Sequence, residues 1–398
     1  LQYALGEEHS FVWAVTNDSI KSFELPPRAE IERAARRVYE LLTARNLAVK
    51  DETTAQRQAR VRLAEEEFKR ASAALAQMIL GPVAAELRPK RIAIVADGAL
   101  QYLPFAALPS PVKSQEASPL IAEHEVVLLP STSALALMRE ELRGRPPTSK
   151  TIAILADAVF DKDDERLAAT AGSRSRNKPS TMLAFAGSEN RALRSFEGLA
   201  KGAGISRRLP FSRREADAIK ALVPAQDAMV ALGFRANRTI ATSPELSQYR
   251  FIHFATHGLL NSEQPELSGI LLSTYDESGK RQNGFLQLHD IYNLKLSADL
   301  VVLSACETAL GKDIRGEGLL GLTRGFMYAG VPRVIASLWQ VDDAATAELM
   351  ETFYKAMLTE GKRPAEALRI AQMRMWQQHN QWSSPYYWAA FTLQGEWN

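Results

Sequence analysis

Two runs of apolar residues in this 398-residue chain end on side chains that can take part in chemistry. RFIHFATHG (250–258) carries His257 followed by Gly258, and DLVVLSAC (299–306) ends on Cys306, the one cysteine of the chain. A thiol becomes a nucleophile when a neighbouring base or a positive setting lowers its pKa, and histidine supplies such a base. These residue types predict nucleophilic acyl chemistry by a His–Cys pair.

The spacing of the two runs favours the same chemistry. Roughly fifty residues between the histidine and the cysteine are enough to return the chain to a neighbouring parallel strand. The carboxyl ends of parallel strands meet at one edge of a sheet, where active sites form. Backbone N–H groups of Gly258 and Cys306 at that edge are suited to stabilising the oxyanion of an acyl-transfer intermediate.

Each member of the pair has an alternative interpretation. His253 lies four residues before His257, and on a strand the two side chains point to the same face. We interpret His253, inside the apolar run, as a hydrogen-bonded core histidine and His257, at its end, as the base. Cys306 as a buried small residue is the alternative to a nucleophile, since free cysteines are often buried. The histidine–glycine pair at a second strand end favours catalysis.

A glycine pattern beyond the cysteine resembles a nucleotide site only in outline. GEGLLG (316–321) matches G-x-G-x-x-G, and Asp342 follows about twenty residues later. That fingerprint needs its first glycine directly after a strand, whereas CETALGKDIR intervenes here, so we expect glycines that serve close helix packing. The histidines and the cysteine lack paired ligand spacings and no G-x-S-x-G elbow occurs, so we predict no metal and no cofactor.

The elements that must position these residues follow residue 90. Short runs that are apolar along their whole length predict strands buried on both faces of a mainly parallel sheet, with helices between them. We expect three helices among them. The first starts at Ser212, which forms a capping box with Glu215, and the second starts after Asp342. The third has Pro364 as its first helical residue. The predicted strands are RIAIVAD (91–97), EVVLLP (125–130), TIAILAD (151–157), RFIHFATH (250–257), DLVVLSAC (299–306), RVIASLW (333–339) and YWAAFTL (387–393).

The N-terminal part has a different pattern. FVWAVTN (11–17) and SFELPP (22–27) predict strands, and two helical stretches follow, the second with apolar residues at helical spacing from Ala64 to Met78. We predict a strand and helical-hairpin region over 1–88 and a second domain over 89–398. A Ser-, Arg- and Gly-rich stretch predicts a mobile insertion over about 160–210.

Composition narrows the function classes. The 48 basic and 46 acidic residues leave a net charge of +2, which indicates neither a nucleic-acid nor a membrane partner. No stretch reaches the roughly 20 apolar residues that span a bilayer. A single cysteine excludes an internal disulfide and fits the reducing cytoplasm. Because the first residue is Leu1 rather than methionine, we expect an excised fragment.

Several stretches resemble a known family. YRFIHFATHGLLN, LSGILLS, VVLSACETALGKDIRGEGLLGLTRGFMYAGVPRVIASLWQVDD and SPYYWAAFTLQGEW are similar to the CHAT domain, a caspase-like cysteine protease module often found behind tetratricopeptide repeats. The resemblance extends to LQYALGEEHSF near the N-terminus and to DGALQYLPFAAL, so it covers most of the chain. The His-Gly and Ala-Cys blocks are shared with the caspase, separase and legumain group.

The resemblance implies a fold and a set of site residues. The fold is a caspase-like three-layer α/β sandwich with a mainly parallel central sheet, plus a small N-terminal α+β region. The resemblance implies that Cys306 is the nucleophile, that His257 is the catalytic histidine and that the backbone amides of Gly258 and Cys306 are the oxyanion donors. In this group the strand after the cysteine pairs with an extended substrate. The implied substrate-binding residues are Ser337, Leu338, Trp339, Gln340 and Asp342.

The resemblance also bears on specificity. Separases carry a similar LWDVTD segment, and an aspartate a few residues later binds the arginine before the scissile bond. Ala347 matches that aspartate here, and Gln340 replaces the aspartate after the tryptophan. We therefore expect a neutral, small or apolar residue before the cleaved bond, with Asp342 or Asp343 as the alternative source of an acidic pocket.

Together these features predict a cysteine endopeptidase that cleaves a protein substrate. The resemblance implies a bacterial regulatory or defence effector controlled by an upstream tetratricopeptide or other sensor region or complex. The alternative is a catalytically silent caspase-like scaffold that only binds partners.

Overall fold

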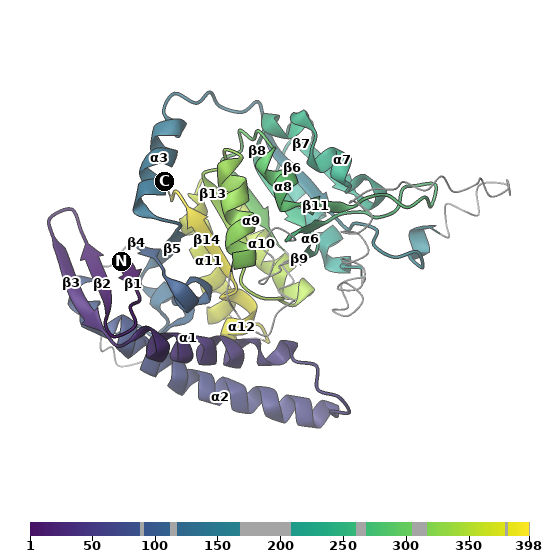
Figure 1. Cartoon of the computed structure of the whole chain (residues 1–398). Helices are drawn as coiled ribbons and strands as arrows, with labels where there is room; N and C mark the ends of the chain where they lie inside the picture. The colour runs from purple at the N-terminus through teal and green to yellow at the C-terminus, as the bar shows by residue number, and fades with distance from the viewer. Residues whose placement is uncertain are drawn as a thin grey trace. The chain divides into compact units, whose positions relative to one another are not determined.

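The computed structural model describes residues 1–87, 91–111, 118–167, 208–259, 268–304, 317–378 and 381–397. The chain forms two compact units, one from Leu1–Pro146 with Ile335–Asn398 and the other from Pro147–Lys312 with Glu317–Val334. Both are mixed α/β structures, and from β5 onward helices lie between several of the strands (Figure 1). The predicted fold class, with a large and mainly parallel sheet, is confirmed.

The strands of the first unit run in the order β3-β2-β1-β4-β5-β14-β13. β1 and β3 pair antiparallel with β2, whereas β4 and β5 are parallel and pair through Ile92↔Val126 and Ile94↔Leu128. The bounds are β1 (Gln2–Ala4), β2 (Ser10–Val15), β3 (Ile20–Leu25), β4 (Arg91–Val95), β5 (Glu125–Leu129), β13 (Arg333–Ser337) and β14 (Phe391–Gly395).

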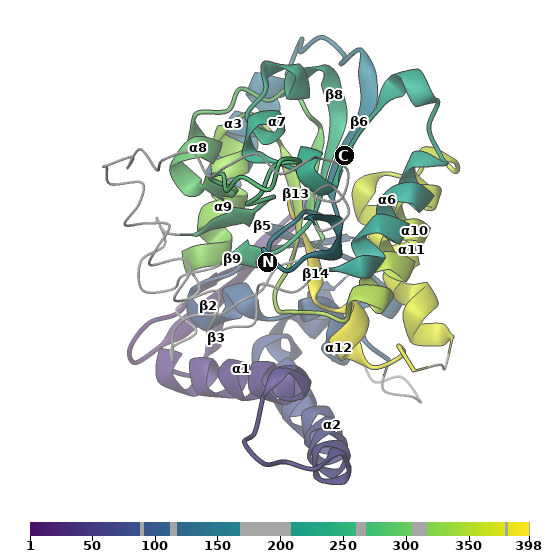
Figure 2. The ribbon, with the colours of Figure 1, turned by 90° about the vertical axis from the view of Figure 1, so that its right-hand side faces the viewer.

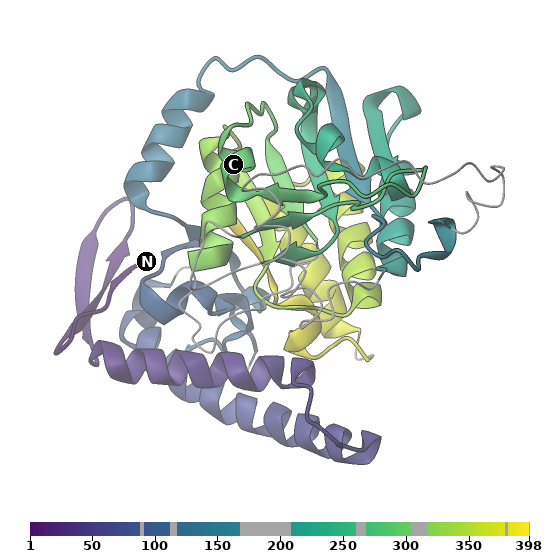
Figure 3. The same ribbon diagram turned by 45° about the vertical axis from the view of Figure 1, so that its right-hand side comes forward.

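Two long helices, α1 and α2, lie side by side in this unit (Figure 3). α1 buries one stripe, Ile31, Ala35, Val38 and Leu42, at helical spacing. α2 begins with a capping box, in which the Thr53 side chain accepts from the Gln56 amide. α10 and α11 form a second neighbouring pair (Figure 2). The helices are α1 (Arg28–Leu42), α2 (Thr54–Ile79), α3 (Thr132–Leu142), α10 (Asp343–Leu358), α11 (Pro364–Gln377) and α12 (Pro385–Trp388), with the 3-10 turn η1 (Thr43–Asn46) after α1.

The second unit has an all-parallel sheet in the order β12-β8-β6-β7. Its strands are apolar on both faces: residues 152–156 of β6 have no exposed surface. A smaller antiparallel sheet, β11-β10-β9, follows the end of β8. The bounds are β6 (Lys150–Ala156), β7 (Ala228–Leu232), β8 (Tyr249–Ala255), β9 (Gly258–Leu259), β10 (Gly269–Leu271), β11 (Phe285–Gln287) and β12 (Leu300–Leu303).

Four helices of this unit are α6 (Pro210–Lys220), α7 (Arg238–Ala241), α8 (Leu288–Tyr292) and α9 (Glu317–Tyr328). α9 contains part of the glycine pattern. A Cβ added to Gly321 of that pattern would lie 3.4 Å from Leu288 Cδ2 of α8, and a tighter contact occurs at Gly325, one turn later in the same helix. A Cβ added to Gly325 would lie 2.9 Å from Leu288 Cδ1 of α8, so only glycine fits there without a shift. Phe326 contacts Phe254 of β8 with 5.9 Å between ring centroids.

Two local predictions were wrong. YWAAFTL begins as helix α12, because Pro385 starts a helical turn, and only its end enters β14. Ser212 is not an N-cap, since α6 begins at Pro210. Its hydroxyl donates to Leu209 O and accepts from the Asp157 amide.

The compact units do not follow the predicted division between residues 88 and 89. The N-terminal strands and helices share the first unit with β4, β5 and the C-terminal helices. The domain boundary stays a prediction. Most of the predicted insertion, residues 168–207, lies outside the described residues.

Candidate active site

The strands that carry the predicted dyad are direct neighbours. β8 and β12 pair parallel, with Val302 opposite His253 and Leu303 opposite Phe254. One residue farther along, the Ser304 amide donates to Phe254 O at 3.0 Å. The two strands therefore end at the same edge of the sheet, as the spacing predicted. His257 follows β8 at this edge, while Cys306, two residues after Ser304, lies outside the described residues.

The backbone of His257 is fixed by the small antiparallel sheet. Its carbonyl accepts from the Leu271 amide at 2.8 Å, and Gly258 pairs with Ile270 in the next strand. The hydroxyl of Thr256 donates to Leu271 O at 2.5 Å. The histidine is thus held between a core strand and β9, and its side chain is 4 % exposed. A rigid strand end of this kind suits a catalytic group.

An aromatic side chain covers the ring of His257. The Phe160 ring lies 4.8 Å from it, centroid to centroid, with 55° between the planes. Phe160 belongs to the loop after β6, where Val159 donates to Ser273 Oγ at 2.9 Å and accepts from the Thr274 amide at 2.9 Å. The Thr274 hydroxyl donates to Phe160 O at 2.9 Å. These bonds fix the loop that presents the ring.

The same loop begins at a buried aspartate in an unusual conformation. Asp157 has φ of +51°, in the left-handed region that aspartate tolerates better than most residues. Its side chain has no exposed surface. A carboxylate so buried needs partners that replace water.

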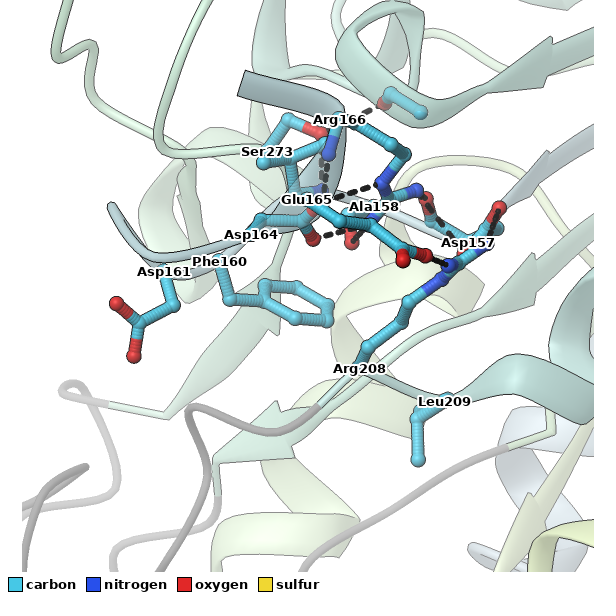
Figure 4. A network of polar contacts seen from close by, with 12 residues as sticks. Asp157, Ala158, Phe160, Asp161, Asp164, Glu165, Arg166, Arg208, Leu209 and Ser273 are labelled. Atoms are coloured by element: carbon cyan, nitrogen blue, oxygen red, sulfur yellow. Dashed lines mark hydrogen bonds and ion pairs between the residues drawn. The ribbon is translucent and has the colours of Figure 1, made fainter. Parts of the chain in front are cut away.

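Arginines supply those partners (Figure 4). Arg208 contacts both carboxylate oxygens of Asp157, at 2.8 and 3.2 Å, and Arg166 lies 3.0 Å from Oδ1. Arg166 also donates to the carbonyls of Asp157 and Ala158, at 2.7 and 3.2 Å. The Asp157 hydrogen bond raises the pKa of Arg208, while Arg166 lowers the pKa of Asp164 by hydrogen bonding. The cluster ties both flanks of residues 168–207 to the loop that carries Phe160.

His253 occupies the core, as predicted for it. It has no exposed surface, and its Nε2 lies 2.8 Å from Oε1 of Glu215, which is 1 % exposed. Glu215 comes from α6, so this buried contact joins the helix to β8. Glu215 was predicted as a capping residue, and the contact explains why the sequence places an acid there.

The predicted substrate-binding residues belong to the first unit. Ser337 ends β13, and Leu338 and Trp339 follow it with no exposed side-chain surface, whereas Gln340 is exposed. Trp339 Nε1 donates to Tyr386 O at 3.0 Å. Asp342 accepts from the Ala345 amide at 3.0 Å and caps α10, in which Ala347 is 3 % exposed. The roles of these residues toward substrate stay predictions.

Asp157 and Phe160 were not predicted as site residues. Asp157 ends a predicted buried strand, but a single aspartate is common at strand ends and does not by itself indicate a site. No local pattern indicates Phe160, because its contact with His257 joins residues far apart in the chain.

The described residues were also searched for a cavity, a metal site and a membrane-spanning helix. A cavity of about 740 Å³ in the first unit is lined by residues such as Leu41, Phe68, Trp376 and Trp388, none of them predicted for the dyad or the substrate. Among the described residues, no group of three or more His, Cys, Asp or Glu side chains is arranged to hold a metal ion. No helix in the described part of the chain is long and apolar enough to cross a membrane.

Comparison with known proteins places these features in a family. The CHAT domain family model matches residues 69–396. Tetratricopeptide repeat protein 28 of Mus musculus is 39 % identical over 106 residues, and its Homo sapiens counterpart is 35 % identical over 114 residues. These matches cover 27 % and 29 % of this chain but 4 % of each relative, so the chain spans a small part of their length.

A solved structure shares the fold. The Saccharomyces cerevisiae separase in its complex with securin superposes with a TM-score of 0.52 over 99 % of this chain and 30 % of that chain, at 10 % identity. At this identity the likeness concerns the fold alone. The fold agrees with a caspase-like protease domain.

Proposed function

The chain belongs to the CHAT domain family, and on that premise we propose that it is a cysteine endopeptidase with a His257–Cys306 dyad. The Cys306 thiolate attacks the carbonyl carbon of the scissile peptide bond. The amides of Gly258 and Cys306 stabilise the oxyanion, as donors do in acyl-transfer enzymes.

His257 moves the protons in this reaction. It takes the thiol proton and gives it to the leaving amine as the carbon–nitrogen bond breaks, which leaves a thioester on Cys306. Water then attacks the thioester with His257 as base, releasing the acid product and restoring the thiol. No cofactor enters these steps.

The observation that supports the proposal most is the register of β8 and β12. Because Leu303 pairs with Phe254, the chain leaves both strands at one edge, within a few residues of His257 and Cys306. A histidine that only serves the core can lie anywhere along a buried strand. His253 is such a residue, since it lies inside β8 and contacts buried Glu215, whereas His257 follows the end of the strand. The fixed backbone of His257 and its Phe160 neighbour add support.

The substrate is proposed to be a protein segment in extended form. Ser337, Leu338, Trp339, Gln340 and Asp342 bind it, chiefly through backbone groups, because Leu338 and Trp339 bury their side chains. A neutral residue before the scissile bond is part of the proposal, since Ala347 and Gln340 stand where the related proteases carry acids. A regulatory or defence role in a bacterial cytoplasm, under a tetratricopeptide or other sensor region, completes it.

The test is cleavage of a peptide library by the wild-type chain and by Cys306→Ala. We expect cleavage after small or apolar residues that is lost in the variant while its circular dichroism is unchanged. A silent scaffold would leave every peptide intact in both samples. A strict requirement for Arg or Asp before the cleaved bond would contradict the proposed specificity alone.

A further inference from the structure

The residues that follow β13 are held by hydrogen bonds to their carbonyl groups. β13 ends at Ser337, and the carbonyls of the next three residues accept hydrogen bonds from side chains. Tyr39 Oη donates to Leu338 O at 2.9 Å, and Asn46 Nδ2 donates to Gln340 O at 2.9 Å. The intervening carbonyl, Trp339 O, accepts from the Ser337 hydroxyl at 3.0 Å. Each carbonyl in the run thus has a side-chain donor.

Tyr386 joins two of these contacts. Its hydroxyl lies 2.6 Å from Asn46 Oδ1 and 3.0 Å from Gln340 O. Burial raises the pKa of Tyr386, so the hydroxyl keeps its proton over the physiological range. The backbone carbonyl of Tyr386 also accepts from Trp339 Nε1. Side chain and backbone of one residue therefore hold both ends of the Trp339–Gln340 pair.

Aromatic packing completes the arrangement. The Tyr39 ring meets the Trp339 ring edge-on, with 5.9 Å between centroids and 83° between planes. Tyr39 lies on α1 and Asn46 on η1, both of which precede the residues matched by the family model. The N-terminal helix is thereby bonded to the segment that we propose binds substrate.

We propose that Tyr39 and Asn46 are positioning residues that hold the backbone of Leu338–Gln340 in the conformation that binds substrate. Peptide binding then depends on the position of α1 and of the turn η1 that follows it. A carbonyl has two lone pairs, and the bond from Tyr39 occupies one on Leu338 O. We infer that the second lone pair of Leu338 O accepts from an added strand, while Asn46 and Tyr386 fix the direction of the Gln340 carbonyl. Losing a donor frees the segment and weakens peptide binding without touching the nucleophile.

This inference rests on the proposed function, and the one cysteine of the chain provides its test. Tripeptide chloromethyl ketones ending in Ala, Leu, Arg or Asp are offered to the wild-type chain, and the fastest is kept as probe. Alkylation of Cys306 is followed by intact mass, and its concentration dependence separates binding of the peptide from the covalent step. Iodoacetamide, which has no peptide part, reports thiol reactivity alone.

Tyr39→Phe keeps the ring contact with Trp339 and removes the hydrogen bond. We expect peptide binding to weaken roughly five- to tenfold, the effect of one lost hydrogen bond, with the covalent step and the iodoacetamide rate unchanged. Asn46→Asp, which removes the donor to Gln340 O, should act in the same direction.

Tyr3→Phe is the matched control. Tyr3 is a buried tyrosine of the same unit whose hydroxyl donates to Ile79 O at 3.0 Å, away from the segment. It should change thermal stability about as much as Tyr39→Phe but leave peptide binding at the wild-type value.

The outcomes separate the two proposals. Wild-type peptide binding in both Tyr39→Phe and Asn46→Asp would overturn the inference while leaving the protease proposal standing. A wild-type chain alkylated by iodoacetamide but by none of the peptide probes would contradict the protease proposal, and the inference with it. Hydrogen exchange of the amides in 338–341 provides a second measurement, and faster exchange in Tyr39→Phe than in Tyr3→Phe is expected.

Discussion

The ring of Phe160 lies 4.8 Å from the ring of His257. Histidine is an effective proton carrier only when one ring nitrogen faces the reacting group, so a neighbour that limits rotation of the ring matters for rate. Phe160 is itself held through Val159, Ser273 and Thr274. The loop after β6 is therefore part of the machinery that orients the proposed base.

Removing the Phe160 ring should slow the chemical step. We expect Phe160→Ala to lower kcat roughly tenfold with little change in KM, because a misplaced catalytic group costs rate rather than binding. Phe160→Leu, which keeps part of the contact, should fall between. The measurement is steady-state cleavage of the best peptide from the library. Phe11→Ala breaks a comparable aromatic pair with Trp13 in the other unit and should leave kcat unchanged.

Neutralising Asp157 should destabilise the second unit. Asp157→Asn keeps the shape and tolerates the positive φ but leaves Arg166 and Arg208 without their buried charge. We expect a loss of about 2–3 kcal/mol, less than for a fully buried pair because the arginines remain partly in water. Urea unfolding measures it. Asp163→Asn, at an exposed position of the same loop, should change the free energy of unfolding by less than about 0.5 kcal/mol.

Low pH should reduce the stability of the loop after β6, because it protonates Asp164. Hydrogen bonds from Arg166 lower its pKa below the ordinary 3.8, so the folded state favours the carboxylate. The stabilisation is full above the ordinary value and is lost as pH falls through the lowered one. Asp164→Asn should therefore cost roughly 1–2 kcal/mol at pH 6 and less at pH 3, which lies below the ordinary value, so that part of the stabilisation is already lost. An equal cost at both values would show that the carboxylate charge is not involved.

His253, in β8, and His257, just after it, should differ in their contributions to stability and to activity. His253→Ala removes the partner that lies 2.8 Å from buried Glu215 and should cost about 3–5 kcal/mol of stability. His257→Ala should cost roughly 1–2 kcal/mol but abolish peptide cleavage. Thermal unfolding and cleavage assays on both variants check this. Normal activity in His257→Ala together with a native-like fold would transfer the catalytic role elsewhere.

Most of the fold could be predicted because its strands are continuous apolar runs. β4, β5, β6, β8, β12 and β13 lie within a residue or a few of the predicted ranges, since strands buried on both faces leave a strong local signal. YWAAFTL misled because its aromatic residues fit a strand as well as a helical turn, and Pro385 decided for the turn. Ser212 misled because its hydroxyl bonds Asp157, a tertiary partner invisible in local sequence.

The candidate site was predictable only in part. His257 and the neighbouring strand of Cys306 follow from local patterns and spacing. Phe160, Asp157 and Tyr39 act through contacts between distant residues, and Tyr39 and Leu338 are 299 positions apart in the chain. Such contacts depend on how loops pack, which no local pattern encodes.

The most direct test of the central claim is the pH dependence of Cys306 alkylation. Iodoacetamide reacts with the thiolate, and the single cysteine makes intact mass an unambiguous readout. If His257 activates Cys306, the wild-type rate should rise with an apparent pKa well below the about 8.5 of a free thiol, and His257→Ala should return it to about 8.5. Identical profiles for the two proteins would contradict the dyad.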